Sequence, residues 1–166
     1  AGADSTPGQG STFWFTARLP EAAQPQPAVV ATTASAADAM KVRGARVLVV
    51  RNTVPAAIAT LQAVEALAAA RAVDCLFKVG GVSTLHHSRF SRQDRPLLDA
   101  QVQEQMGKQR STRPGGAGLV VIGTQTLEQS LDIDADLLIT DLCPMDVLLQ
   151  RLGRLHRHDR AQRPSG

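Results

Sequence analysis

Aromatic side chains are scarce in this 166-residue chain, which has no tyrosine, one tryptophan and four phenylalanines. They are Phe13, Trp14, Phe15, Phe77 and Phe90. A surface that stacks successive nucleobases needs several exposed rings, so the composition argues against such a platform. We therefore expect any contact with a nucleic acid to be made to its backbone.

Cysteine is also rare, with only Cys75 and Cys143, both among apolar residues. Neither belongs to a C-x-x-C pair, so no disulfide framework or zinc site is indicated. Two buried thiols in a reducing cytoplasm are the simplest interpretation. The chain's other metal-ligand candidates, His86, His87 and His156, lack carboxylate or cysteine partners at ligand spacing, and we predict no metal site.

Long apolar runs are missing as well, and none approaches the length of a membrane span. We recognise no signal peptide and predict a cytoplasmic protein with no membrane partner. The chain lacks an initiating methionine and starts with small residues, so we expect it to be a piece of a longer protein. Its formal net charge of +3 favours a polyanionic partner.

The N-terminal part is weakly patterned. Residues 1–10 are rich in glycine and other breakers, which predicts irregular structure. Residues 12–19 are compatible with a strand, and residues 20–27, rich in Pro, Gln and Ala, predict a linker. We therefore divide the chain into a segment of irregular structure, strand and linker over residues 1–27 and a folded domain over residues 28–166.

Residues 46–153 alternate apolar runs with helical patterns. The unbroken runs at 47–50, 119–122 and 137–139 predict buried parallel strands, and residues 74–79 predict another. Thr53 with Pro55 begins a helix that ends at Ala70. Ser91 or Asp94 begins the next helix, and residues 145–152 form a short one that ends at Gly153. This pattern predicts an open parallel α/β sheet, whose ligands bind at the C-terminal ends of its strands.

Residues 150–157, Q-R-L-G-R-L-H-R, carry three arginines at three-residue spacing. The planar, permanently charged guanidinium suits phosphate oxygens, so Arg151, Arg154 and Arg157 predict a surface that meets a polyanion. A solvated basic helix end is the alternative.

Residues 123–134 directly follow a predicted buried strand. Thr124 and nearby backbone amides at a strand end can hold a phosphodiester without reading its sequence, and Asp132 can accept a hydrogen bond from a ribose hydroxyl. A loop in which Thr124, Ser130 and Asp132 bond only to the backbone is the alternative.

Taken in order, residues 47–53, 123–134 and 150–157 resemble motifs IV, V and VI of the C-terminal RecA-like lobe of superfamily 2 helicases, and the last matches Q-R-x-G-R-x-x-R. The resemblance covers residues 47–158. Residues 85–90 with Asp94 and Arg95, together with residues 124–134, 139–144 and 148–158, further resemble the CRISPR-associated helicase–nuclease of type I interference systems. Glu-Gln-Ser-Leu-Asp at 128–132 is typical of that family.

The resemblance implies a three-layer RecA-like fold with helices on both faces of the sheet. It implies a motor in which ATP lies between two such lobes, with Arg154 and Arg157 as arginine fingers. Gln150 and Arg151 would couple ATP to the 123–134 loop, and Asp132 would approach the ribose. The residues that would lie near the backbone of single-stranded DNA are Arg51, Asn52, Ser88, Arg89, Thr124 and Gln125.

The family's other parts are missing from this sequence. It has no G-x-x-x-x-G-K-[ST] and no Asp-Glu-x-His box, so the phosphate cradle and the Mg²⁺ site would belong to a first lobe in the parent chain. The implied partners are that lobe, a nuclease domain and the CRISPR guide-RNA surveillance complex, and we expect no ATPase activity from this chain alone. The alternatives are another superfamily 2 helicase acting on DNA or RNA, and a non-catalytic docking module that uses Arg160 and Arg163.

Overall fold

The structure is a computed structural model that describes residues 2–6, 10–14, 44–110, 117–128, 131–161 and 163. The chain divides into two compact units, Ala1–Thr33 and Ala34–Gly166. The predicted boundary at residues 27 and 28 and the predicted linker lie outside the described residues.

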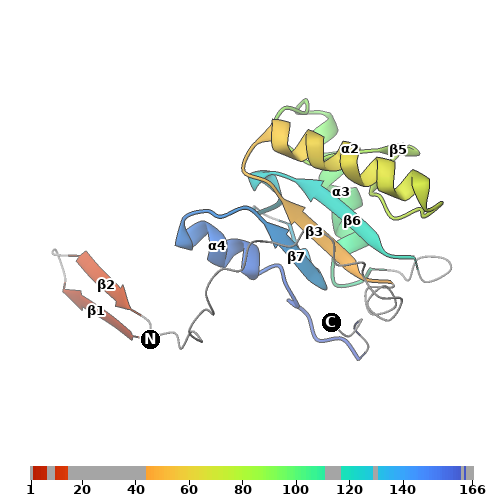
Figure 1. Cartoon of the computed structure of the whole chain (residues 1–166). Coiled ribbons are helices and arrows are strands. Elements are labelled where there is room, and N and C mark those ends of the chain that lie inside the picture. The colour runs from red at the N-terminus through yellow and green to blue at the C-terminus, as the bar shows by residue number, and fades with distance from the viewer. Residues whose placement is uncertain are drawn as a thin grey trace, which may run out of the picture. The chain divides into compact units, whose positions relative to one another are not determined.

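The first unit contains an antiparallel pair of strands, β1 (Gly2–Thr6) and β2 (Gly10–Trp14), with Gly2 opposite Trp14 (Figure 1). The prediction of irregular structure is wrong for residues 2–6 and for Gly10, because strand pairing satisfies their backbone groups whatever the local content of breakers. The predicted strand at 12–19 is confirmed as far as Trp14, and its remaining residues lie outside the described ones.

The second unit is built on a parallel sheet. Strand β3 (Arg46–Val50) lies between β6 (Leu119–Gly123) and β7 (Leu137–Thr140), and it is parallel to both. Single bridges extend this sheet, from Leu76 and His86 to β6 and from Leu155 to Ala135 just before β7. The predicted parallel sheet is confirmed.

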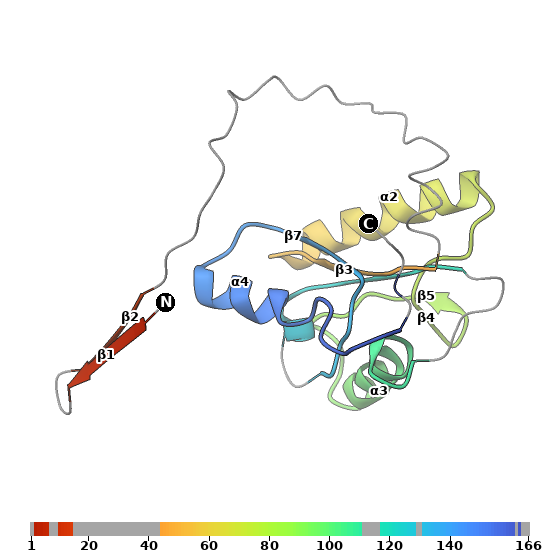
Figure 2. The ribbon, with the colours of Figure 1, turned by 90° about the horizontal axis from the view of Figure 1, so that it is seen from below.

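Helices cover both faces of this sheet, as Figure 2 shows for α2 (Val54–Ala70) and α3 (Asp94–Met106). Side chains of a strand alternate between the faces, so Leu48 packs in the cluster that contains Val102 of α3, whereas Val49 packs with Ala57 of α2. Both clusters are buried, and apolar burial of this kind is the main stabilising term of a fold. The predicted three-layer α/β architecture is therefore confirmed.

The start of α2 follows its sequence signal, because the hydroxyl of Thr53 accepts a hydrogen bond from the amide of Ala56 at 3.3 Å. The start of α3 follows its signal only in part. Ser91 Oγ accepts a bond from the amide of Asp94 at 3.1 Å, but the residue at the cap position is Gln93, whose side chain makes no capping bond. The third helix, α4 (Met145–Leu152), has the predicted bounds and is followed by Gly153. Within the described residues, no helix combines the length and apolar composition needed to cross a bilayer.

The prediction of a strand over residues 74–79 is only partly right. Leu76 makes one bridge to Val120, and the chain then forms a hairpin of β4 (Lys78–Val79) and β5 (Val82–Ser83). Gly80 and Gly81 have φ values of +58° and +83°, which glycine adopts without steric cost and which suit a two-residue hairpin turn. The turn therefore ends the parallel pairing early.

Candidate functional site

The C-terminal ends of the three strands are joined by polar bonds. After β3, the Asn52 amide donates to Asp141 Oδ2 at 2.8 Å, and Arg51 pairs with the same carboxylate at 3.3 Å. After β6, Gln125 Nε2 donates to the Asn52 carbonyl at 2.8 Å. Three segments far apart in the sequence thus form one edge, where ligands of parallel sheets bind.

Arg151 lies at the centre of this edge and is only 1% exposed. Its Nε donates to Glu128 Oε1 at 2.7 Å, its Nη1 to Thr140 Oγ1 at 2.6 Å and its Nη2 to Asn52 Oδ1 at 2.9 Å. One side chain therefore links the segments that follow β3, β6 and β7. A solvated basic helix end does not describe Arg151, although the neighbouring Gln150 is exposed.

Arg154 is half-buried against the loop that follows β6. Its guanidinium donates to the carbonyls of Glu128 and Leu131. Within the described residues its Nε is buried and has no hydrogen-bond partner. Burial, followed by the charge of Arg157, lowers the pKa of Arg154 from its ordinary value. An anion placed beside this group would offset both effects, because it would give the buried donor an acceptor and stabilise the charge.

Arg157 and Asp132 face one another. Arg157 Nε lies 3.1 Å from Asp132 Oδ1, and the Arg157 side chain is 43% exposed. His158 Nε2 donates to both Asp132 oxygens, at 2.9 and 3.0 Å. His158 lies in the stretch 148–158 that carries the resemblance, but no role for it was predicted from the sequence.

A hollow of about 290 Å³ brings together Asp132, Arg154 and Arg157 of the predicted nucleotide residues, but not Gln150 or Arg151. It is lined by Gln103, Leu131, Asp132, Arg154 and Arg157. Two of its charged side chains are cationic and one is anionic, so the arrangement suits a ligand that carries negative charge. Gln103 comes from α3 and was not predicted, since nothing in the sequence relates that helix to residues 150–157.

The predicted nucleic-acid residues lie on neighbouring loops of the same edge. Gln125 is exposed, and so are Ser88 and Arg89, which follow the residue bridged to Gly123. Thr124 is only 2% exposed, and its amide donates to the His86 carbonyl at 2.9 Å. The structure thus brings these positions together but buries the Thr124 side chain.

His86 forms a buried polar link beneath these loops. Its Nε2 lies 2.6 Å from Asp99 Oδ1 on α3, and its Nδ1 lies 2.8 Å from Thr126 Oγ1. Burial lowers the pKa of His86, although the bond to Asp99 opposes this. Within the described residues no group of three or more His, Cys, Asp or Glu side chains could hold a metal ion.

Arg160 and Arg163 point inward rather than toward solvent. Both bond to Asp134, which is fully buried, and Arg163 also bonds to Asp136 at 2.8 Å. Reversing these charges would therefore disrupt the fold of a motor lobe as well. The interpretation of Arg160 and Arg163 as a docking surface has no support in this arrangement.

Known proteins named Cas3 are similar to this chain in sequence. The Cas3 endonuclease/helicase of Escherichia coli K12 is 48% identical over 82 residues, which are 49% of this chain and 9% of that protein. The Cas3 nuclease/helicase of Streptococcus thermophilus is 51% identical over 74 residues, 45% of this chain and 8% of that protein. The chain thus spans about a tenth of the length of these curated relatives.

Solved structures are similar to this chain as well. T. fusca Cas3 with ADP superposes with a TM-score of 0.62 and 33% identity, covering 75% of this chain and 14% of that one. A CRISPR RNA-guided surveillance complex, pre-nicking, gives a TM-score of 0.54 and 31% identity, covering 73% of this chain and 13% of that one. The family model described as "CRISPR-associated nuclease/helicase Cas3, C-terminal" matches residues 43–160. The chain therefore belongs to the family of the C-terminal region of the CRISPR-associated nuclease/helicase Cas3.

Proposed function

We propose that this chain is the second motor lobe of an ATP-dependent helicase or translocase that acts on single-stranded DNA in type I CRISPR interference. The observation that carries the proposal is the hollow at which Asp132, Arg154 and Arg157 converge. Solved relatives include T. fusca Cas3 with ATP, with AMPPNP and with ADP, which supports a nucleotide as the ligand.

The chemistry assigned to the hollow is neutralisation of phosphate charge. Phosphoryl transfer spreads negative charge over the γ-phosphate oxygens, and an arginine finger contributes about 10³ to 10⁵ in rate. Arg154 is held against loop carbonyls, whereas Arg157 is exposed and, within the described residues, pairs with Asp132 Oδ1. Arg157 is therefore the finger that can turn toward a nucleotide held by a facing lobe, and Arg154 is the one fixed in place.

Coupling between nucleotide and nucleic acid is assigned to Arg151. It bonds to Glu128, on the loop that carries the hollow, and to Asn52, at the predicted nucleic-acid edge. A shift of the 123–134 loop would move Glu128, and the Arg151 guanidinium would transmit this displacement to Asn52. Asp132 is proposed to meet the ribose, in competition with Arg157 and His158, and Gln150 to act beside Arg151.

The nucleic-acid contact is assigned to the exposed edge. Ser88, Arg89 and Gln125 offer a hydroxyl, a guanidinium and an amide to phosphate oxygens. Arg51 and Asn52 lie on the Gln125 side, where Gln125 bonds to the Asn52 carbonyl. Thr124 is proposed to act through its backbone and through the shape of its turn, because its side chain is buried. The partners proposed for the parent chain are the first motor lobe, a nuclease domain and the guide-RNA surveillance complex.

The test is an Arg157→Ala substitution in a chain that carries both lobes. DNA-stimulated ATPase activity should fall by about 10³ or more, while affinity for single-stranded DNA changes less than threefold, since Arg157 lies at the hollow. Arg71→Ala is the matched control, because Arg71 is exposed at the far end of α2.

An ATPase rate of Arg157→Ala equal to that of the control would refute the finger assignment. The 166-residue chain alone should show no steady ATPase activity, since it has no P-loop. Steady turnover by the isolated chain, abolished by Arg154→Ala, would contradict the proposed division of labour between two lobes.

A further inference from the structure

Two rings stack on the loop that carries Ser88 and Arg89. The centroids of the His87 and Phe90 rings are 4.5 Å apart and the ring planes are inclined by 22°. Ser88 and Arg89, which lie between them in sequence, are exposed. This is the only ring pair found in the described part of the chain, and the nucleotide site does not use it.

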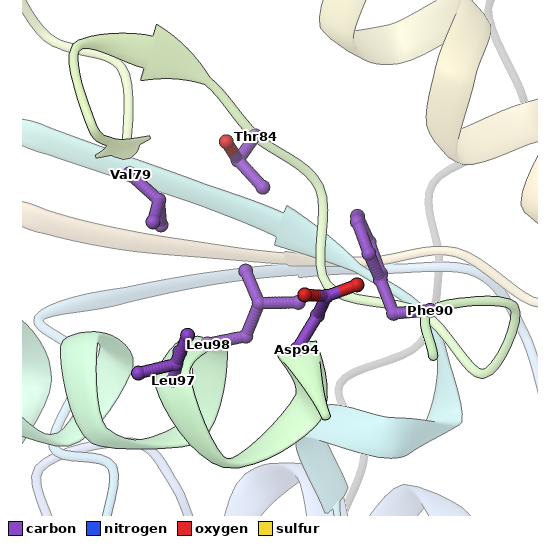
Figure 3. A pocket seen from close by; sticks show the side chains of 6 residues that line it. All are labelled: Val79, Thr84, Phe90, Asp94, Leu97 and Leu98. Atoms are coloured by element: carbon purple, nitrogen blue, oxygen red, sulfur yellow. The ribbon is translucent and has the colours of Figure 1, made fainter. Parts of the chain in front are cut away.

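Phe90 fixes this pair from below. It packs against the core cluster that contains Leu98, and it lines a pocket of about 210 Å³ with Val79 and Leu97. Figure 3 shows the Phe90 ring beside this pocket, above the first turn of α3. The ring is thus half-buried between the core and this pocket.

The ring of His87 is fixed from the side. The amide of Arg89 donates to His87 Nδ1 at 3.2 Å, so the remaining ring proton of a neutral imidazole resides on Nε2. Burial and the nearby charge of Arg89 lower the pKa of His87 from its ordinary value, which favours this neutral form at pH 7. The result is an oriented, uncharged aromatic plane at the edge of a basic loop.

We propose that His87, supported by Phe90, stacks on one nucleobase of a single strand whose phosphates are held by Ser88 and Arg89. Histidine is among the side chains that stack on unpaired bases, and such stacking tolerates every base because each has a π-face. The scarcity of aromatics argues against a row of stacked bases but permits this single position. The inference rests on the proposed function, in which the same edge binds the strand's backbone.

The test compares two strands that share a backbone. Affinity of the 166-residue chain is measured by fluorescence anisotropy for a dT 12-mer and for an abasic 12-mer. The unsubstituted chain should bind the dT strand at least about fivefold more tightly, since stacking is worth about 1–3 kcal/mol per base. His87→Ala should bring this ratio close to one, and His87→Phe should restore it.

Arg89→Ala is the matched control, because loss of a phosphate contact should weaken both strands by the same factor and leave the ratio unchanged. A ratio of one for the unsubstituted chain, or a ratio that His87→Ala leaves unchanged, would overturn the stacking site while the backbone contact stands. Failure of the chain to bind either strand would overturn the stacking site and the proposed nucleic-acid contact together.

Discussion

Three arginines of one octet illustrate how far the surroundings of identical side chains can differ. Arg151 is buried and bonds to a carboxylate and two other side chains, Arg154 is half-buried against carbonyls, and Arg157 is exposed beside Asp132. A guanidinium has a fixed fork of donors, so each environment uses it differently. The three positions therefore differ in what their substitution should do.

Arg151 should matter most for stability. Arg151→Met would leave Glu128 as a buried carboxylate without its partner, which costs about 3–5 kcal/mol. Urea unfolding followed by far-UV circular dichroism measures this loss. Tryptophan fluorescence is unsuitable, because the single tryptophan, Trp14, lies in the other compact unit. Gln150→Ala, the exposed neighbour, should change the free energy of unfolding by less than about 0.5 kcal/mol.

A double variant separates charge burial from packing. Arg151→Met combined with Glu128→Gln removes both charges, so it should recover part of the loss. A loss below about 1 kcal/mol for Arg151→Met alone would mean that this buried pair does not hold the strand ends together.

Among the elements, the two turns that frame the site use glycine for different reasons. Gly153 has φ −63° and ψ −4°, an ordinary right-handed conformation, and a Cβ there would lie 3.4 Å from its nearest neighbour. At Gly123, the last residue of β6, a Cβ would lie 2.3 Å from the His86 carbonyl oxygen. The close approach of two backbones requires glycine at Gly123, whereas the helix end at Gly153 does not.

Substitution of these glycines should separate the two cases. Gly123→Ala should cost about 1–3 kcal/mol of unfolding free energy, because the added methyl forces the backbone at His86 to move. Gly153→Ala is the matched control and should be neutral within about 0.5 kcal/mol or slightly stabilising. Denaturant midpoints of the two variants decide the matter, and equal midpoints would contradict the steric argument.

At the scale of the whole molecule, a buried ionic network attaches the C-terminal segment to the sheet. Asp134 and Asp136 precede β7, and they bond to Arg163 and to Arg110 or Arg160. Leu155 of the C-terminal segment also forms a β-bridge with Ala135, just before β7. The network therefore holds the C-terminal segment that contains Arg154 and Arg157 beside the 123–134 loop.

This network should make the free energy of unfolding depend on pH in the acidic range. Burial alone raises the pKa of Asp134, but bonds from Arg163 and Arg160 outweigh it and lower that pKa to about 2. The unfolded chain then binds more protons than the folded one between the ordinary value of 3.8 and about 2. Stability from this pairing is full above about pH 4 and is lost as the pH falls toward 2.

We expect this loss to amount to about 1–2 kcal/mol, measured as the fall in unfolding free energy between pH 5 and pH 2.5. Asp134→Asn should be less stable at pH 5 and should show a smaller fall. The control Asp159→Asn removes an exposed carboxylate of the same segment, and its fall should match that of the unsubstituted chain. An identical fall for Asp134→Asn would exclude Asp134 as the source.

The sequence determined the order of the parallel strands β3, β6 and β7 and of the helices α2, α3 and α4 by itself, because buried parallel strands are unbroken apolar runs and Thr53 marks a helix start. It did not predict β1 or the hairpin of β4 and β5. It also placed the basic octet after β7, and the resemblance assigned the family. Tertiary structure decided that Arg151 is the buried arginine of the octet and that Arg160 and Arg163 form ion pairs with Asp134. It also decided that Gln103 lines the hollow and that His158 bonds to Asp132 beside it. These depend on contacts between residues more than 20 positions apart. Local sequence patterns predict the periodicity of helices and strands. They do not predict which charged group or ring, distant in the sequence, a side chain contacts in the fold.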